Sequence, residues 1–385
     1  GNAAGNVMFV VAAREADSKT FTAKCNVTAA VAAATITSGA AVVDTQSATL
    51  DAANSANDTS AVLDATANLA ASTTIAGVND TTKRDVMRKV MRALKAVIQR
   101  RQNESETNAD ASSAMTAEER RSMIFNMATL LRNKTRAVLD NETRSDAATI
   151  LKALVKRRVA SAITNEEEDD DMTEEDAEAA VDVVGALPMT RDLKNATDAL
   201  AKRLAASQSS VGVNTTLQSG NVTIAVLSAA GDATGESEVG IANRATMRPP
   251  KNISLGNATE LDTVSFSAAI YSGDERPLPT TGINTATTQQ TSDTVEFSVQ
   301  KNGVDVVVRN LTSPVNISLK LNRASAAAET LTCRYYNEAT GSWATDGVTT
   351  EIVSATEVNC LSDHLTTFGA FAEGAAATPN PTPEP

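Results

Sequence analysis

The chain has 385 residues, a formal net charge of −13 and an aromatic content of only 3%. This length is sufficient for two or three domains with cores of their own. The acidic balance argues against nucleic acid as a partner, because the phosphate backbone is bound through clustered Lys and Arg. No apolar run in the sequence is long enough to span a membrane.

The N-terminal residues 1–45 favour strands. Two β-prone runs, Val7–Ala12 and Thr20–Val27, are joined by a short polar segment and predict a hairpin. We interpret residues 1–45 as the tail of a preceding β-rich extracellular domain. The chain starts at Gly1 without an initiator Met or a signal pattern, so we expect a processed product or an excerpt of a longer chain.

Residues 46–207 are predicted to form a helical domain, because apolar residues recur there at spacings of three and four. Thr116 and Glu119 form a capping box at the start of one helix. Lys83–Arg101 is basic and amphipathic; a helix packed in a bundle is preferred there over one lying on a membrane surface. The predicted helical stretches are Asp58–Ala71, Thr82–Arg101, Thr116–Val138, Ile150–Val159, a stretch through Val181 and Val184 to Gly185, and Leu193–Leu204.

An acidic run, Glu166–Asp171, follows the third strongly periodic helix. Ca²⁺ prefers carboxylate oxygens, but the run lacks the glycine and the alternating spacing of a calcium loop. We therefore interpret it as a solvated linker, and we expect no metal site and no cofactor in the chain.

Residues 208–373 change to a strand pattern. Asn302-Gly303 predicts a two-residue hairpin turn between two of the strands, and Glu275–Asp293 is expected to be a polar, variable loop. Residues 374–385 are Pro-rich and are expected to be an extended linker. The predicted strands are Val222–Leu227, Val264–Tyr271, Val295–Val299, Val304–Val308 and Leu311–Leu319. The fold class is therefore α+β, with helices first and an antiparallel β-sandwich after them.

The scarce residue types gather near the C-terminus, where the only His, the only Trp and two of the three Cys fall within about 35 positions. A Thr hydroxyl is a weak nucleophile that needs a base, and His is the side chain best suited to that task. If His364 and Thr366 share one face of a strand, the imidazole lies within reach of the hydroxyl. Attack on the carbonyl of Leu365 would then give an ester that water hydrolyses. Two ordinary strand residues are the alternative at this spacing.

This stretch resembles the G-protein-coupled-receptor proteolysis site (GPS), which ends the autoproteolysis-inducing (GAIN) domain of adhesion-class receptors and polycystin-like proteins. Tyr336 stands where the family usually has Trp. Of the usual four cysteines, the second and fourth places are taken by Val348 and Ser362. The matching residues are Cys333, Tyr335, Tyr336, Asn337, Trp343, Cys360, His364, Leu365, Thr366 and Phe368.

The resemblance implies a role for each of these positions. His364 is the base, Thr366 the nucleophile and Leu365 the residue whose carbonyl is attacked, while Cys333 and Cys360 form a disulfide. Tyr336, Trp343 and Phe368 support the motif. Residues 46–207 correspond to GAIN subdomain A and residues 208–373 to subdomain B, with the GPS motif at residues 333–368. After cleavage the C-terminal strand stays bound to its own domain, which makes it the first expected partner.

Thirteen Asn-x-Ser/Thr sequons favour a glycosylated protein of the secretory pathway. Few cysteines are compatible with that compartment if one disulfide forms, which leaves Cys25 either paired outside the chain or buried as a free thiol. The sequons are at Asn26, Asn57, Asn79, Asn103, Asn133, Asn141, Asn195, Asn214, Asn221, Asn252, Asn257, Asn310 and Asn316.

The predicted function is a self-cleaving extracellular or cell-surface module that cuts itself once between Leu365 and Thr366. An uncleaved structural or adhesion module of the same fold is the alternative. A turnover hydrolase is disfavoured, since no Gly-x-Ser-x-Gly elbow occurs. Extracellular protein or glycan partners are expected, and a membrane only through segments outside this chain. The reduced cysteine set and the Phe-Gly-Ala sequence from Phe368 resemble the polycystin and egg-jelly-receptor side of the family.

Overall fold

The computed structural model describes residues 9–14, 20–25, 39–73, 75, 78–107, 115–132, 139–155, 172–207, 212, 214–230, 238–250, 263–272 and 278–374. The acidic run at 166–171 and the Pro-rich tail after Gly374 lie outside these residues. The predicted N-terminal hairpin is present, because β1 (Phe9–Arg14) and β2 (Thr20–Cys25) pair antiparallel.

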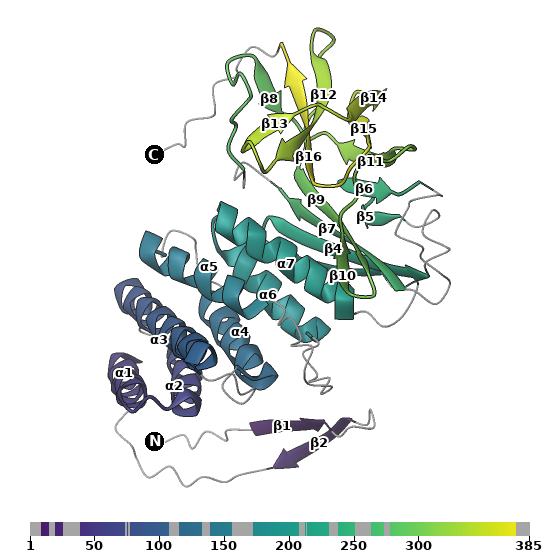
Figure 1. Cartoon of the computed structure of the whole chain (residues 1–385). Coiled ribbons are helices and arrows are strands. Elements are labelled where there is room, and N and C mark those ends of the chain that lie inside the picture. Colours follow the sequence, from purple (N-terminus) through teal and green to yellow (C-terminus); the bar gives the residue numbers. More distant parts are fainter. Residues whose placement is uncertain are drawn as a thin grey trace.

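Seven helices follow in the described part of the chain (Figure 1), and six of them, α2 to α7, lie at stretches where the periodicity predicted a helix. The first of them begins at Gly39, where strands were still expected. The capping box of Thr116 is present, and Thr173 forms a second one with Asp176 that the sequence analysis missed. None of the described helices combines the length and the apolar character needed to cross a membrane. The helices are α1 (Gly39–Ser55), α2 (Thr59–Ser72), α3 (Asp80–Thr107), α4 (Ala117–Leu131), α5 (Asn141–Val155), α6 (Glu174–Ala186) and α7 (Arg191–Ser207).

Two antiparallel sheets follow the helices. The larger has the order β13-β12-β16-β9-β7-β4-β3, with β10 on β9 and β8 on β16; the smaller has the order β14-β15-β11-β6-β5. The strands are β3 (Asn214–Ser219), β4 (Val222–Ala230), β5 (Val239–Ile241), β6 (Ala245–Arg248), β7 (Thr263–Tyr271), β8 (Thr288–Gln290), β9 (Thr294–Lys301), β10 (Val304–Val306), β11 (Val315–Lys320), β12 (Thr330–Asn337), β13 (Ser342–Ala344), β14 (Val348–Ser354), β15 (Glu357–Ser362) and β16 (Thr367–Glu373).

The larger sheet is covered on both faces. Phe266 of β7 and Ile317 of β11 belong to one core between the two sheets, which makes the β part a sandwich. Ile224 and Tyr271 point the other way, into the core of the helical part. Figure 1 shows α7 lying against the central strands of this sheet. Because both faces are covered, nearly every residue of β4 and β7 is buried, Ser and Thr included, and the strands lack the alternating exposure of a half-exposed strand.

The segment Glu275–Asp293 was expected to be a polar loop, and this prediction was wrong for its second half. Its last residues form β8 and pair with the C-terminal strand β16, and Gln290 is buried there. The sequence hides this because Thr, Gln and Ser are exposed in most proteins and are buried here through hydrogen bonds. The predicted turn at Asn302-Gly303 is confirmed, since both residues have positive φ between the paired β9 and β10.

Candidate functional site

The segment that carries the candidate reaction is a turn. β15 ends at Ser362 and β16 begins at Thr367, so His364, Leu365 and Thr366 lie in the connection between two strands that belong to different sheets. The expectation that His364 and Thr366 share one strand face is therefore wrong. Because the chain passes from one sheet to the other at this point, it cannot form one continuous strand here. The relative position of His364 and Thr366 is set instead by contacts from other segments.

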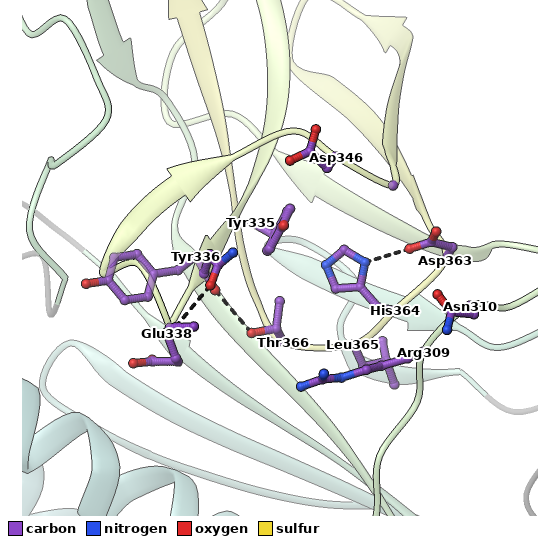
Figure 2. A pocket seen from close by; sticks show the side chains of 13 residues that line it. Arg309, Asn310, Tyr335, Tyr336, Glu338, Asp346, Asp363, His364, Leu365 and Thr366 are labelled. Carbon is purple, nitrogen blue, oxygen red and sulfur yellow. Dashed lines mark hydrogen bonds and ion pairs between the residues drawn. The ribbon is translucent and has the colours of Figure 1, made fainter.

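These three residues line a cavity of about 520 Å³ together with residues from β12 and from three neighbouring connections. Figure 2 shows the side chains of Tyr335 and His364 close together. One edge of the imidazole faces Asp363, and Thr366 lies on the side of the opposite edge. The complete lining is Arg309, Asn310, Tyr335, Tyr336, Asn337, Glu338, Ala339, Asp346, Gly347, Asp363, His364, Leu365 and Thr366.

The imidazole of His364 is mostly buried, with 16% of its side chain exposed. Nδ1 lies 2.7 Å from Oδ1 of Asp363. Nε2 is buried without a hydrogen-bond partner among the described residues. Tyr335 meets the ring edge-on, with centroids 4.3 Å apart and planes at 79°. One ring nitrogen therefore contacts a carboxylate, and the other has no hydrogen-bond partner among the described residues.

The peptide bond between Leu365 and Thr366 is held by main-chain contacts on both sides. The amide of Leu365 donates to the carbonyl of Val308 at 3.2 Å, and the carbonyl of Thr366 accepts from the amide of Phe297 at 3.1 Å. The hydroxyl of Thr366 donates to the carbonyl of Tyr336 at 3.4 Å. The described hydrogen bond of this hydroxyl is thus to the main chain, although catalytic contacts often tighten only as the reaction proceeds.

Cys333 and Cys360 form a disulfide with a Cα–Cα distance of 5.6 Å, as the resemblance implied. It joins β12 of the larger sheet to β15 of the smaller one. Val348 and Ser362, which occupy the places of the missing cysteine pair, are direct cross-strand partners on β14 and β15. The two substituted positions therefore still face each other. Cys25 lies in β2, but its side chain is outside the described part.

The three supporting residues lie around the strand that follows the turn. Phe368 is fully buried in the sandwich core. On the other face of β16, Tyr336 packs edge-on against Trp343, and Trp343 against Phe371, with centroid distances of 5.6 and 4.9 Å. The indole nitrogen of Trp343 donates to the carbonyl of Pro279 at 3.2 Å. Aromatic contacts on this face thus anchor the C-terminal strand.

The described sequon asparagines divide into two groups by exposure. The exposed ones are Asn57, Asn79, Asn103, Asn141, Asn195, Asn214 and Asn310; the partly buried ones are Asn221 and Asn316. Asn316 lies on β11, which is paired with β15 on one side and with β6 on the other. Asn26, Asn133, Asn252 and Asn257 lie outside the described residues.

A buried charge cluster, which no sequence pattern predicted, lies next to the start of β16. Lys194 of α7 is 2% exposed, and its ammonium lies 2.7 Å from Asp198 and 2.9 Å from Glu296 of β9. Glu296 also accepts a hydrogen bond from the hydroxyl of Thr367, and Asp198 one from Tyr271. No local spacing connects a helix residue with strands that follow about a hundred residues later, so no sequence signal was present.

The pKa values of Asp198 and Lys194 in this cluster are strongly perturbed. Burial and the charge of Glu296 raise the pKa of Asp198 to about 6, although Lys194 acts in the opposite direction. Burial alone would lower the pKa of Lys194, but the two carboxylates outweigh it and leave that pKa raised. Lys194 therefore stays charged at neutral pH. Through Glu296, which binds both Lys194 and Thr367, it connects α7 to the first residue of β16.

Comparison with known proteins identifies part of the chain. Residues 205–372 match the family model GPS, described as GAIN subdomain B. No curated protein matches the chain. Among solved structures, the full extracellular region of zebrafish Gpr126/Adgrg6 shows 13% sequence identity and a TM-score of 0.32, over 75% of this chain and 35% of that one. The chain thus spans about a third of that structure's length. Residues 205–372 of this chain are a GAIN subdomain B with a GPS motif.

Proposed function

We propose that this protein cleaves itself once, between Leu365 and Thr366. The observation that supports this best is the pocket at the start of β16, where a mostly buried imidazole with a free Nε2 shares the cavity with the hydroxyl of Thr366. Nε2 accepts the hydroxyl proton while Oγ1 attacks the carbonyl carbon of Leu365. The C–N bond then breaks, the proton passes to the amide nitrogen, and an ester joins Leu365 to the Thr366 side chain.

Hydrolysis of that ester by one water gives a new carboxylate on Leu365 and a free amine on Thr366. The released segment would remain in place, since β16 lies between β12 and β9 in the larger sheet. Phe368 and Phe371 of β16 are both fully buried. Each contributes roughly 1.5 to 3 kcal/mol through burial, and the strand pairing adds to this. The products would therefore travel together until the domain unfolds.

We infer that the module works outside the cell, with the helical part from α1 (Gly39–Ser55) to residue 207 as its GAIN subdomain A and the hairpin of β1 and β2 as the end of a preceding domain. The expected boundary at residue 45 falls inside α1, so the helical part begins earlier than its sequence pattern predicted. The disulfide and the exposed sequons support an oxidising, secretory environment. The missing cysteine pair favours the polycystin and egg-jelly-receptor side of the family. Protein or glycan partners would then bind the larger protein to which this module belongs.

An uncleaved structural module is the second candidate function. The observation that favours it is the hydrogen bond from the Thr366 hydroxyl to the carbonyl of Tyr336, which turns the nucleophile toward the main chain. Val348 and Ser362 stand where the family usually has a second disulfide, so one covalent link next to the turn is missing. In this case β16 would serve only as a strand of the β-sandwich.

The intact mass of the secreted, deglycosylated and denatured chain separates the two functions. Self-cleavage predicts two fragments, the second beginning at Thr366. The variant Thr366→Ala should stay whole, Thr366→Ser should still be cut, and His364→Ser should be cut much more slowly. A wild-type chain that stays whole would contradict self-cleavage and favour the structural module. Hydroxylamine should trap the ester as a hydroxamate on Leu365, which tests the chemical route.

A further inference from the structure

The carboxylate of Asp363 holds the imidazole of His364 from the side opposite the free ring nitrogen. An ionised carboxylate only accepts hydrogen bonds, so the proton between Oδ1 and Nδ1, which are 2.7 Å apart, belongs to Nδ1 in the neutral ring. The lone pair of the neutral imidazole is then on Nε2, the nitrogen without a partner. A base must present this lone pair to the hydroxyl that it deprotonates.

Asp363 is itself fixed by two segments distant in sequence. Its amide donates to the carbonyl of Gly347 at 3.1 Å, and its carbonyl accepts from the amide of Leu311 at 2.9 Å. Gly347 has a φ of +73°, and a Cβ added there would lie 2.3 Å from Oδ1 of Asp363. The turn at Gly347 therefore leaves space for the carboxylate only because it carries no side chain.

The main chain of His364 is fixed as well. The hydroxyl of Ser362 donates to the carbonyl of His364 at 2.7 Å and accepts from its amide at 3.2 Å. Tyr335 limits rotation of the ring from its edge. With the backbone, one ring edge and Nδ1 all held, the direction in which Nε2 points is set before any reaction begins.

We propose that Asp363 is a positioning residue for self-cleavage at Thr366. It keeps His364 in the tautomer with a free Nε2 and stabilises the imidazolium that forms when the Thr366 proton arrives. The carboxylate stays ionised throughout, and no proton passes to it. This inference rests on the proposed function for its catalytic consequence, but the tautomer of His364 is a property of the folded chain that can be measured without cleavage.

The first test uses the single histidine of the chain. Thr366→Ala protein labelled with ¹⁵N-histidine and purified without a histidine tag gives one imidazole spectrum, whose nitrogen shifts report the tautomer. We expect a protonated Nδ1 and an unprotonated Nε2 at neutral to mildly alkaline pH. Adding Asp363→Ala should convert the spectrum to a mixture or to the opposite tautomer. A protonated Nε2 before that substitution, or an unchanged spectrum after it, would overturn the proposal.

The second test is the cleavage rate, followed by pulse-chase in secreting cells. Asp363→Ala and Asp363→Asn should slow cleavage by about 10- to 100-fold, the usual effect of losing a partner that orients a reactive group. Asp363→Glu should restore most of the rate, because it restores the carboxylate. Glu351→Gln removes the same charge from an exposed residue of β14 that does not line the cavity and should cut at the wild-type rate.

The two tests separate failure of this inference from failure of the proposed function. A wild-type chain that is never cut rejects self-cleavage, and the spectrum then still decides whether Asp363 sets the tautomer. A wild-type chain that is cut, with Asp363→Asn cut at the same rate, rejects the positioning role alone. Melting of Asp363→Asn in the Thr366→Ala background within a few degrees of its parent should exclude unfolding as the cause of slow cleavage.

Discussion

Replacing Lys194 by Met is expected to destabilise the protein far more than the loss of an ordinary surface charge. Lys194 is the cation between two carboxylates, Asp198 and Glu296, and is 2% exposed. Met retains most of the apolar stem but removes the charge. Removing one partner of a buried ion pair typically costs 3 to 5 kcal/mol. Since the carboxylates are 12% and 21% exposed, we expect a loss of about 3 kcal/mol, at the lower end of that range.

The loss should depend on pH in a defined direction. The pKa of Asp198 in the folded protein is about 6, above the value of about 3.9 in an unfolded chain. Between these values the native state binds more protons, so this group's contribution to stability falls as pH rises through the window. Lys194 lowers the pKa of Asp198, so its removal should raise that pKa further. The pH range over which Asp198 makes the folded state less stable then extends to higher pH. The free-energy penalty of Lys194→Met should therefore grow between pH 5 and pH 8.

The assay is urea unfolding in the Thr366→Ala background, where β16 stays covalently attached, followed by circular dichroism and by fluorescence of the single Trp343. Lys202→Met is the matched control on the same helix. Its pair with Asp305 is 2.8 Å long but more exposed, at 33% and 52%, so a loss below about 1 kcal/mol is expected. A penalty for Lys194→Met equal to that of Lys202→Met, or one that does not change with pH, would refute the reasoning.

Three further changes test the site and its strand. Gly347→Ala should slow cleavage, because its Cβ would collide with the Asp363 carboxylate; an unchanged rate in folded protein would contradict that close contact. Replacing Cys333 and Cys360 by Ser should lower the free energy of unfolding by about 3 to 4 kcal/mol, measured by urea titration with and without reductant; the double variant should no longer respond to reductant. Phe371→Ala, at a fully buried position, should cost about 3 to 5 kcal/mol and speed dissociation of the cleaved strand, measured by gel filtration at rising urea.

Thr367 links the charge cluster to the proposed cleavage site through a hydrogen bond to Glu296. Thr367 directly follows the nucleophile, and its hydroxyl donates to the same oxygen of Glu296 that Lys194 binds. The first residue of the retained strand is therefore joined through Glu296 to α7.

The sequence by itself determined the order of the elements and the identity of the reactive stretch. The helical spacing of Val86, Val90 and Leu94 predicts a buried stripe, and all three residues are buried. The strands around Asn302-Gly303 follow from turn chemistry. The motif from Cys333 to Phe368 could be recognised because its residue types and spacings are local features of the chain, which need no knowledge of the remaining structure.

Only the tertiary structure decided how those residues meet. His364 and Thr366 lie in a turn between two sheets, so the alternation of a single strand does not relate them. The partners of this turn, among them Val308, Leu311 and Gly347, come from other connections. The burial of polar residues in β8 and the ion pairs of Lys194 likewise depend on contacts between distant segments. Hydrogen bonds and charges over such separations leave no periodicity in the sequence, because their geometry exists only once the sheets and helices have packed.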